Sequence, residues 1–401
     1  MNLRRVLLST LTILLVLSGV ACTDGDDRPA ADPAGRGEVV TVTPVLEMTG
    51  AQTADYLAEW KYPVAGAKGV GAYRVVYGTV APDGTPTTAS GLVVIPETAG
   101  PALRMVSYAH GTTVRRDEAP SADGETERAR TIMFAAAGYA AVAPDYLGLG
   151  EGPGPHPYAH APSEASASAD LLTAARTVLA DQGRDTRPDV LVTGFSQGAQ
   201  AGLALGQQLH SGAVAGFGLA ASATVSGAYA VREVQAPGAL DGRVDPKRAV
   251  VYLAYWITAM NRIYHVYGDP AEAFRAPYAQ RVEELFDGHH DLLSVTAGLP
   301  RTPQELLTPE YLALAQNPTG PALRAMDDSD TVCDWAPDAP VRLYAAQGDR
   351  SVPFENSQQC TKAELGARAE LIDLGDIDHG ATVRTALPQI LDWFRKTAPP
   401  A

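Results

Sequence analysis

From about residue 71 to residue 225, short apolar runs alternate with longer segments that have the hydrophobic spacing of helices. This alternation is typical of a mostly parallel sheet with helices on both faces. The first two predicted strands form an antiparallel pair, with a turn at Pro82-Asp83-Gly84 between them. The predicted strands are 73–80, 89–95, 103–108, 139–143, 190–193 and 215–220, and the predicted helices are 127–137, 166–181 and 197–209.

The alternation stops after residue 225. Residues 226–338 contain helical patterns at 248–266, 280–286 and 303–315, with no convincing strand among them. A strand at 341–346, a helix at 356–365, a strand at 370–374 and a closing helix at 382–396 then follow. We therefore expect an α/β core in two parts, residues 39–225 and 339–401, with a helical insertion between them.

The N-terminus has the features of an export signal. Arg4 and Arg5 precede an apolar run, 6–17, that is too short to cross a bilayer comfortably. Residues 18–22, Ser-Gly-Val-Ala-Cys, resemble a lipoprotein processing site, which implies a signal peptide at 1–21 and a lipid on Cys22. We expect an exported protein held to a membrane by this lipid, with 22–38 as a flexible tether; the alternative is a cleaved signal and a secreted protein.

Composition narrows the class of protein and its partners. The 401-residue chain is 46% hydrophobic and 19% charged, as globular proteins are. Its formal net charge of −15 disfavours nucleic acid and anionic lipid headgroups as partners. If Cys22 is lipidated, Cys333 and Cys360 remain as a pair in an oxidising compartment, and we predict a disulfide between them.

Ser196 is the strongest candidate for chemistry. It follows an apolar, β-branched run and precedes a helix rich in Ala and Leu, with Gly194 and Gly198 two positions to either side. The glycine pattern alone is weak evidence, but a strand-to-helix turn is the setting that a nucleophile elbow requires. The turn strains the serine backbone, and the glycines leave room for strand and helix to approach closely. We predict a nucleophile; the alternative is a serine that only caps the helix.

A serine hydroxyl needs a base beside it and a carboxylate that holds the base in the right tautomer. In α/β folds with a nucleophile elbow the order along the chain is Ser, acid, His. His379 follows the last predicted strand and is our candidate base, with a surface histidine as the alternative. Asp349 follows strand 341–346 after a glycine and is our candidate acid. Asp378 is the rival, but neighbouring residues rarely face each other productively.

Attack on a carbonyl creates an oxyanion that needs two backbone donors. We expect the amide of Gln197, directly after the nucleophile, to be one of them. The other should come from the loop after strand 103–108, with Thr112 preferred to Thr113. His110, in the same loop, is interpreted as a residue that orders the loop and not as the base.

Two further patterns are weaker. The glycine-rich run 144–154 matches neither a dinucleotide fingerprint nor a P-loop, so we interpret it as a flexible loop lining the site. His289 and His290 beside Asp291 lack a matching ligand at helical spacing, so no metal site is predicted. No cofactor is expected.

Together these segments resemble the α/β-hydrolase superfamily, and within it the secretory lipase family and related actinobacterial esterases. The likeness covers about residues 70–396, although that family usually carries a small residue where Gln197 stands. It implies that the insertion 226–338 forms a helical lid over an acyl-binding pocket. The motifs that carry it are Ser-Tyr-Ala-His110-Gly-Thr, Pro-Asp145-Tyr-Leu-Gly-Leu-Gly, Gly194-Phe-Ser196-Gln-Gly, Asp349 and His379.

The sequence therefore predicts a carboxylic ester hydrolase, an esterase or lipase that transfers an acyl group from a small-molecule or lipid ester to water. The nearly all-round apolar helix 249–264 either packs in the core or contacts the acyl chain. A serine peptidase and a non-catalytic binding lipoprotein are the alternative functions. We expect the protein to be a monomer.

Overall fold

The computed structural model describes residues 34–98, 100 and 102–400. The predicted signal peptide 1–21 and Cys22 lie outside the described residues. Within the described part of the chain, nine strands form one sheet, and a separate pair, β4 (Ala102–Leu103) and β7 (Asp185–Thr186), lies apart from it. The order across the sheet is β1 (Val39–Met48), β2 (Val70–Val80), β3 (Pro86–Pro96), β6 (Ala140–Pro144), β5 (Met105–Ala109), β8 (Asp189–Phe195), β9 (Gly218–Val225), β10 (Val341–Ala345) and β11 (Ala369–Asp373).

The sheet is antiparallel at one end and parallel over the rest. The pairs β1–β2, β2–β3 and β3–β6 are antiparallel, and every pair from β6 to β11 is parallel. This arrangement confirms the predicted fold class, including the opening antiparallel hairpin. Because parallel strands all end at the same edge, residues that follow β5, β8, β10 and β11 can meet there although they are far apart in sequence.

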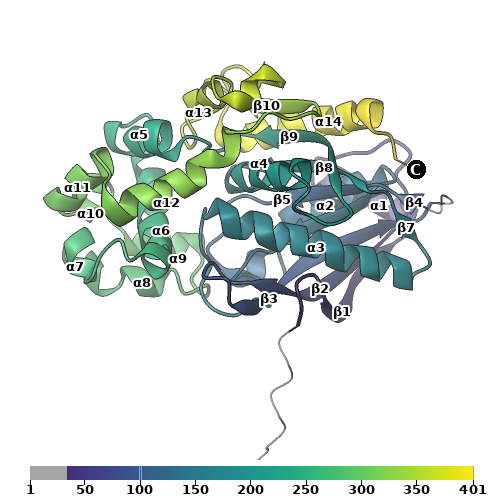
Figure 1. Cartoon of the computed structure of the whole chain (residues 1–401), viewed down its shortest axis with the longest axis horizontal. Helices are drawn as coiled ribbons and strands as arrows, with labels where there is room; N and C mark the ends of the chain where they lie inside the picture. The colour runs from purple at the N-terminus through teal and green to yellow at the C-terminus, as the bar shows by residue number, and fades with distance from the viewer. Residues whose placement is uncertain (1–33, 99, 101, 401) are drawn as a thin grey trace, which may run out of the picture. The chain divides into compact units, whose positions relative to one another are not determined.

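Helices cover both faces of the sheet (Figure 1). On one face, α3 (Ala161–Asp181) and α4 (Gln197–His210) pack on Val190 and Val192. On the other face, α1 (Gly50–Glu59), α2 (Glu125–Ala136) and α14 (His379–Thr397) pack around Leu191. Successive residues of β8 thus point to opposite cores, which explains why a strand buried on both sides is apolar throughout.

Residues 226–340 contribute no strand to the sheet in the structure, and their helices stand to one side of it (Figure 1). These helices bury a hydrophobic core between them. The long helix α6 supplies much of this core, from Ala249 to Met260. Val114 and Tyr158, from the sheet-bearing part, complete it. The helices are α5 (Ala236–Asp241), α6 (Pro246–Tyr264), α7 (Pro270–Ala273), α8 (Val282–Leu285), α9 (Leu292–Gly298), α10 (Pro303–Leu306), α11 (Pro309–Gln316) and α12 (Gly320–Asp330).

Several predicted element boundaries were wrong. Strand 215–220 is in fact β9, Gly218–Val225, because Gly216 has a positive φ of 74° and turns the chain before the strand begins. Helix 303–315 is divided into α10 and α11, with Pro309 starting the second. Strand β1 and helix α1 were not predicted; β1 is an edge strand with mostly exposed side chains, so it lacks a clear apolar alternation.

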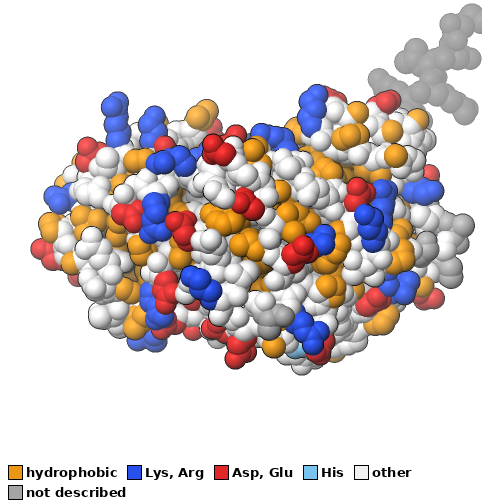
Figure 2. Space-filling model, turned by 90° about the horizontal axis from the view of Figure 1, so that it is seen from above, with side chains coloured by type: hydrophobic (Ala, Val, Ile, Leu, Met, Phe, Trp, Pro, Cys, Tyr) orange, Lys and Arg blue, Asp and Glu red, His pale blue; other side chains and the backbone are white. Residues whose placement is uncertain are grey.

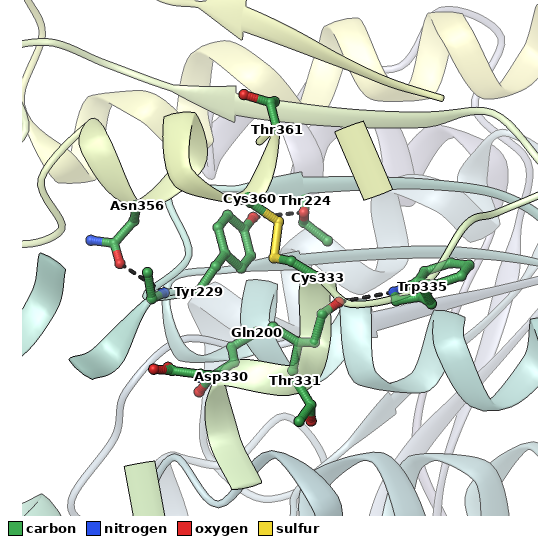
Figure 3. The surroundings of a disulfide bond; sticks show 12 residues. Gln200, Thr224, Tyr229, Asp330, Thr331, Cys333, Trp335, Asn356, Cys360 and Thr361 are labelled. Carbon is green, nitrogen blue, oxygen red and sulfur yellow. Dashed lines mark hydrogen bonds between the residues drawn. A yellow bond between two sulfur atoms is a disulfide. The ribbon is translucent and has the colours of Figure 1, made fainter. Parts of the chain in front are cut away.

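The predicted disulfide between Cys333 and Cys360 is present, with the two Cα atoms 5.3 Å apart (Figure 3). It joins the turn after α12 to α13 (Glu355–Cys360). Near it, the Gln200 carboxamide of α4 donates to the backbone oxygens of Ala228 and Ser329, at 3.0 and 3.2 Å. The bridge closes a loop that contains Asp349, so it ties the end of the insertion to the segment that follows β10.

The surface carries both signs of charge. On the face drawn in Figure 2, acidic side chains alternate with Lys and Arg, so this face is not a uniform field of negative charge. In the part of the chain that the structure describes, no helix combines the length and the apolar character needed to cross a bilayer.

Removing the disulfide tests its contribution to stability. We expect the double variant Cys333→Ser/Cys360→Ser to lose about 3 kcal/mol of unfolding free energy, because the bridge restricts the unfolded chain. Denaturant unfolding of both proteins, with and without reductant, measures this. Reductant should destabilise the wild type and leave the double variant unchanged; equal stability of the two proteins would contradict the prediction.

Candidate active site

Ser196 lies at the sharp turn between β8 and α4. Its backbone has φ 58° and ψ −121°, a conformation that is costly for a residue with a Cβ. Its N–H donates to the carbonyl of Val225 on β9, at 2.8 Å, which helps to fix the turn against the neighbouring strand. This is the strained strand-to-helix turn of a nucleophile elbow, and it raises Ser196 above the carboxyl edge of the sheet.

The glycines on either side allow this turn to form. A Cβ on Gly194 would lie 2.0 Å from the carbonyl oxygen of Gly198, and a Cβ on Gly198 would lie 2.1 Å from that of Ala109. These atoms belong to backbone, which cannot move aside easily. Three backbone segments, β8, α4 and the end of β5, are therefore packed so closely that only glycine fits at both positions.

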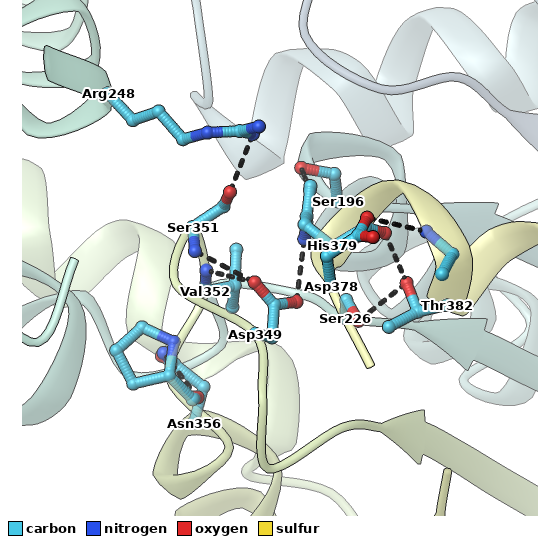
Figure 4. A network of polar contacts seen from close by, with 12 residues as sticks. Ser196, Ser226, Arg248, Asp349, Ser351, Val352, Asn356, Asp378, His379 and Thr382 are labelled. Carbon is cyan, nitrogen blue, oxygen red and sulfur yellow. Dashed lines mark hydrogen bonds and ion pairs between the residues drawn. The ribbon is translucent and has the colours of Figure 1, made fainter. Parts of the chain in front are cut away.

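The structure brings Ser196, His379 and Asp349 into one chain of hydrogen bonds (Figure 4). His379 Nε2 lies 3.0 Å from Ser196 Oγ, and His379 Nδ1 lies 2.6 Å from Asp349 Oδ2. All three side chains are buried, with at most 7% of each residue exposed. A carboxylate can only accept, so Nδ1 carries the proton and the lone pair of Nε2 faces the serine hydroxyl.

Asp349 is held on its other oxygen as well. Oδ1 accepts the backbone N–H groups of Ser351 and Val352, at 2.8 and 3.0 Å (Figure 4). The rival carboxylate, Asp378, instead caps α14 by accepting from the N–H of Ala381 at 3.0 Å. Asp349 therefore faces the imidazole with a fixed orientation, whereas Asp378 is committed to its own helix.

The two predicted oxyanion donors come from segments that border Ser196. Gln197 is the first residue of α4, and residues 111–114 form the wall of a recess that also contains Ser196 and His379. The Thr112 hydroxyl bonds the Tyr158 hydroxyl at 2.9 Å, while that of Thr113 donates to Glu118 at 2.8 Å.

The glycine-rich run 144–154 does not line the site, contrary to the prediction. Its Asp145 is fully buried and accepts from Ser90 at 2.6 Å and from Ser121, which ties β3 to the loop before α2. The ring of His110 lies against Tyr146 and within hydrogen-bond distance of the Asp145 carbonyl. The run thus packs against the loop of residues 110–113, and it contributes no residue to the walls of the spaces beside Ser196.

Ser196 opens onto a long cavity with almost entirely apolar walls. The insertion provides most of the wall, from helices α6, α11 and α12, and Gln197 and Gln200 of α4 also line it. One side of helix 249–264 packs in the core of the insertion, as one of the two alternatives expected, and its other side lines this cavity. Prominent wall residues are Tyr158, Leu253, Trp256, Ile257, Leu314 and Met326.

A second, more polar recess meets the first at Ser196 and Tyr252. Its wall contains His379, the loop 111–114 and Arg248. Arg248 donates to the hydroxyl of Ser351 at 2.7 Å, next to the Asp349 loop (Figure 4). A molecule spanning both spaces would place an apolar part in the long cavity and a more polar part on the histidine side.

Behind Gln197 lies a buried polar cluster that sequence reasoning missed. The Gln197 carboxamide nitrogen contacts Glu164 Oε1 at 2.6 Å and His156 Nε2 at 2.8 Å. Burial raises the pKa of Glu164 to about 8 and lowers that of His156 to about 3. The available signal was a lone acid in the apolar, Ala-rich start of helix 161–181.

The fold, the elbow and the order of residues along the chain are those of an α/β-hydrolase. The chain belongs to the alpha/beta hydrolase family, whose profile matches residues 128–380. This confirms the predicted superfamily. A search of the curated proteins finds no significant match.

Solved structures extend the likeness over nearly the whole chain. The rice cell wall degrading esterase LipA from Xanthomonas oryzae is 27% identical, with a TM-score of 0.78 over 90% of this chain and 98% of that one. A protein of Legionella pneumophila is 26% identical, with a TM-score of 0.83 over 90% and 98%. Candida antarctica lipase A in its closed state is 14% identical, with a TM-score of 0.65 over 91% and 82%, and shares the fold.

The close backbone packing at the elbow predicts the effect of adding one methyl group. Gly198→Ala should lose about 1–3 kcal/mol of unfolding free energy, because its Cβ meets the carbonyl of Ala109. Gly218→Ala is the matched control, since a Cβ there has open space within 4 Å. Thermal or denaturant unfolding compares the two variants, and a Gly198→Ala protein as stable as the control would contradict this account of the turn.

Proposed function

We propose that the protein is an exported serine hydrolase that cleaves carboxylic esters with Ser196, His379 and Asp349 as its catalytic triad. The observation that carries the proposal is the unbroken hydrogen-bond chain from Ser196 Oγ through the imidazole to Asp349. The esterase LipA, similar along 98% of its length, supports ester cleavage as the reaction. The apolar cavity beside Ser196 suits an acyl group.

The reaction proceeds through an acyl-enzyme. Ser196 Oγ attacks the ester carbonyl while its proton passes to His379 Nε2, and Asp349 stabilises the imidazolium that forms. The backbone N–H groups of Gln197 and Thr112 stabilise the oxyanion. As the C–O bond breaks, His379 returns the proton to the leaving alcohol. A water molecule then repeats the sequence at the acyl carbonyl, releasing a carboxylic acid and restoring Ser196.

The insertion 226–338 has the role of a lid and acyl pocket in this proposal, because its helices form most of the long cavity. The acyl chain lies in this cavity, and the alcohol part lies in the polar recess beside His379. Substrates are thus small-molecule or lipid esters with an apolar acyl group. No cofactor takes part in any step.

Export is the second part of the proposal. The leader 1–21 directs secretion, a lipid on Cys22 anchors the chain, and residues 22–38 form the tether. The Cys333–Cys360 disulfide supports an oxidising location outside the cytoplasm. Mass spectrometry of the mature N-terminus tests this directly: a diacylglycerol adduct on Cys22 supports the anchor, and an unmodified N-terminus contradicts it.

Removing the nucleophile tests the reaction. Ser196→Ala should lower kcat on chromogenic esters by about 10⁴-fold or more, because no other hydroxyl takes its place in the hydrogen-bond chain. Asp349→Asn should lose a comparable factor, since the imidazole is then held in the wrong tautomer. A fluorophosphonate probe should label Ser196 in the wild type. Equal esterase activity in wild type and Ser196→Ala would contradict the proposal, and cleavage of peptides but not esters would favour a peptidase.

Filling the long cavity should shift the preferred acyl length. Ala315 of α11 lines the cavity, so Ala315→Trp should lower kcat/KM for long-chain esters by roughly 10-fold while acetate esters change little. Ala313→Trp is the matched control, because Ala313 is exposed on the same helix. Kinetics over acyl chains of rising length compare the two variants. A uniform loss for all chain lengths would contradict acyl binding in this cavity.

A further inference from the structure

The cluster behind Gln197 joins three segments that are far apart in the sequence. Glu164 lies in the first turn of α3, Gln197 begins α4, and His156 belongs to the loop between β6 and α3. Each of the three residues is at most 5% exposed. Glu164 Oε1 also accepts the N–H of Ala159, at 3.1 Å, which closes the turn before its own helix.

The hydrogen positions in this cluster follow from its partners. His156 Nδ1 lies 2.8 Å from the carbonyl oxygen of Leu147, which can only accept, so Nδ1 carries the ring proton. Nε2 is then an acceptor and takes one N–H of the Gln197 carboxamide. The other N–H points to Glu164. Both protons of this carboxamide are therefore held, and its orientation is fixed.

Two oxygen atoms of the cluster are left over. Glu164 Oε2 and Gln197 Oε1 are buried and have no hydrogen-bond partner among the described residues. If Glu164 is ionised, both atoms are acceptors without a donor, which is costly in a buried site. A proton on Glu164 Oε2 removes one of these two unpaired acceptors, and the buried charge with it.

No cation compensates a charge on Glu164 within the described part of the chain. The titratable groups around it are His156 and three tyrosines, and burial raises the pKa of each tyrosine and lowers that of the histidine, so all four are neutral at pH 7. These tyrosines, Tyr146, Tyr158 and Tyr255, come from the loop after β6, the loop before α3, and α6. Burial likewise keeps the Glu164 carboxyl neutral at pH 7, since its pKa is raised to about 8.

We propose that neutral Glu164 is a positioning residue that, together with His156, holds Gln197 so that its backbone N–H points to the oxyanion, and that ionisation of Glu164 lowers the rate. This inference rests on the proposed ester hydrolysis. Two effects act in the same direction. An ionised Glu164 leaves two buried acceptors without a donor, which favours rearrangement of the cluster that holds Gln197, and it places a negative charge behind the residue whose N–H binds the oxyanion.

The expected pH dependence follows from the sign of the shift. A carboxyl whose native pKa is raised to about 8 keeps its proton below that pH, so the enzyme has its full rate there. As the pH rises through about 8, the carboxyl loses its proton and the rate falls. Ground-state binding does not involve the oxyanion. The loss should therefore appear in kcat, with KM nearly constant.

The test measures kcat and KM on a chromogenic ester from pH 6 to pH 10. The wild type should lose kcat with a midpoint near pH 8. Glu164→Gln, which retains a hydrogen-bonding group but cannot ionise, should keep most of kcat at pH 7 and remain active past that midpoint. Glu164→Ala should lose kcat by about 10–100-fold at every pH, because Gln197 is no longer held. Asp170→Asn, the same chemical change in α3 at a residue bonded to Arg36 and Thr79, should show the wild-type profile.

Different results would overturn the role of Glu164 and the proposed function on which it rests. An alkaline loss that persists unchanged in Glu164→Gln, or a wild-type kcat in Glu164→Ala, would overturn the role of Glu164. Ester hydrolysis that does not depend on Ser196 would overturn the proposed function instead.

Stability gives a readout independent of turnover. In the unfolded chain the Glu164 carboxyl has its ordinary pKa of 4.5, so the folded protein binds this proton more tightly than the unfolded chain does. The unfolding free energy of the wild type should therefore fall as the pH rises from about 4.5 to about 8. Glu164→Gln should show a smaller fall over this range.

Discussion

The site depends on one steric constraint, the contact of three backbone segments at Gly194, Gly198 and Ala109. With any side chain at either glycine, β8 and α4 would have to separate, and the turn between them would open. The strained φ of Ser196 is tolerated because the surrounding backbone leaves no other path. The packing of β8, α4 and the end of β5 thus stabilises the strained turn that presents the Ser196 hydroxyl. The same contact fixes the position of the Gln197 backbone N–H, the first in α4.

The carboxyl edge of the sheet explains why distant residues meet. Each residue of the hydrogen-bonded group Ser196, Asp349 and His379 follows a parallel strand. The insertion lies between β9 and β10 in the sequence, so it begins at the same edge of the sheet. The helices of the insertion bury most of their apolar side chains in a core that is separate from the cores on the two faces of the sheet. Their inner side chains decide the shape of the long cavity. The architecture therefore separates the groups proposed to react, which the core holds in place, from the proposed acyl-binding wall, which the insertion forms.

The sequence was informative wherever a pattern has a direct physical cause. Strands buried on both sides are apolar, so the sheet and the residues at its edge were predictable. The close approach of Ser196, His379 and Asp349 followed from that edge. The ends of helices and strands were less predictable, because a turn such as that at Gly216 depends on the local backbone conformation and not on hydrophobic periodicity. The run 144–154 misled for a similar reason: Gly150 packs against buried Asp145, and glycine content alone does not tell a supporting loop from a lining one. The partners of Gln197 could not be found at all, since Glu164 and His156 meet it only through the fold.

Two buried carboxyl groups lie near Ser196, and their surroundings give them opposite characters. Asp349 faces three N–H groups, two from the backbone and one from His379, so its negative charge is well compensated. Glu164 has one side-chain amide and one backbone N–H, and its second oxygen has no donor among the described residues. In the proposed mechanism, Asp349 stabilises the imidazolium that forms on one side of Ser196, and a neutral Glu164 avoids a charge that would oppose the oxyanion on the other. The fold thus directs three N–H donors at Asp349, with at least one on each oxygen, and two at Glu164, both on the same oxygen.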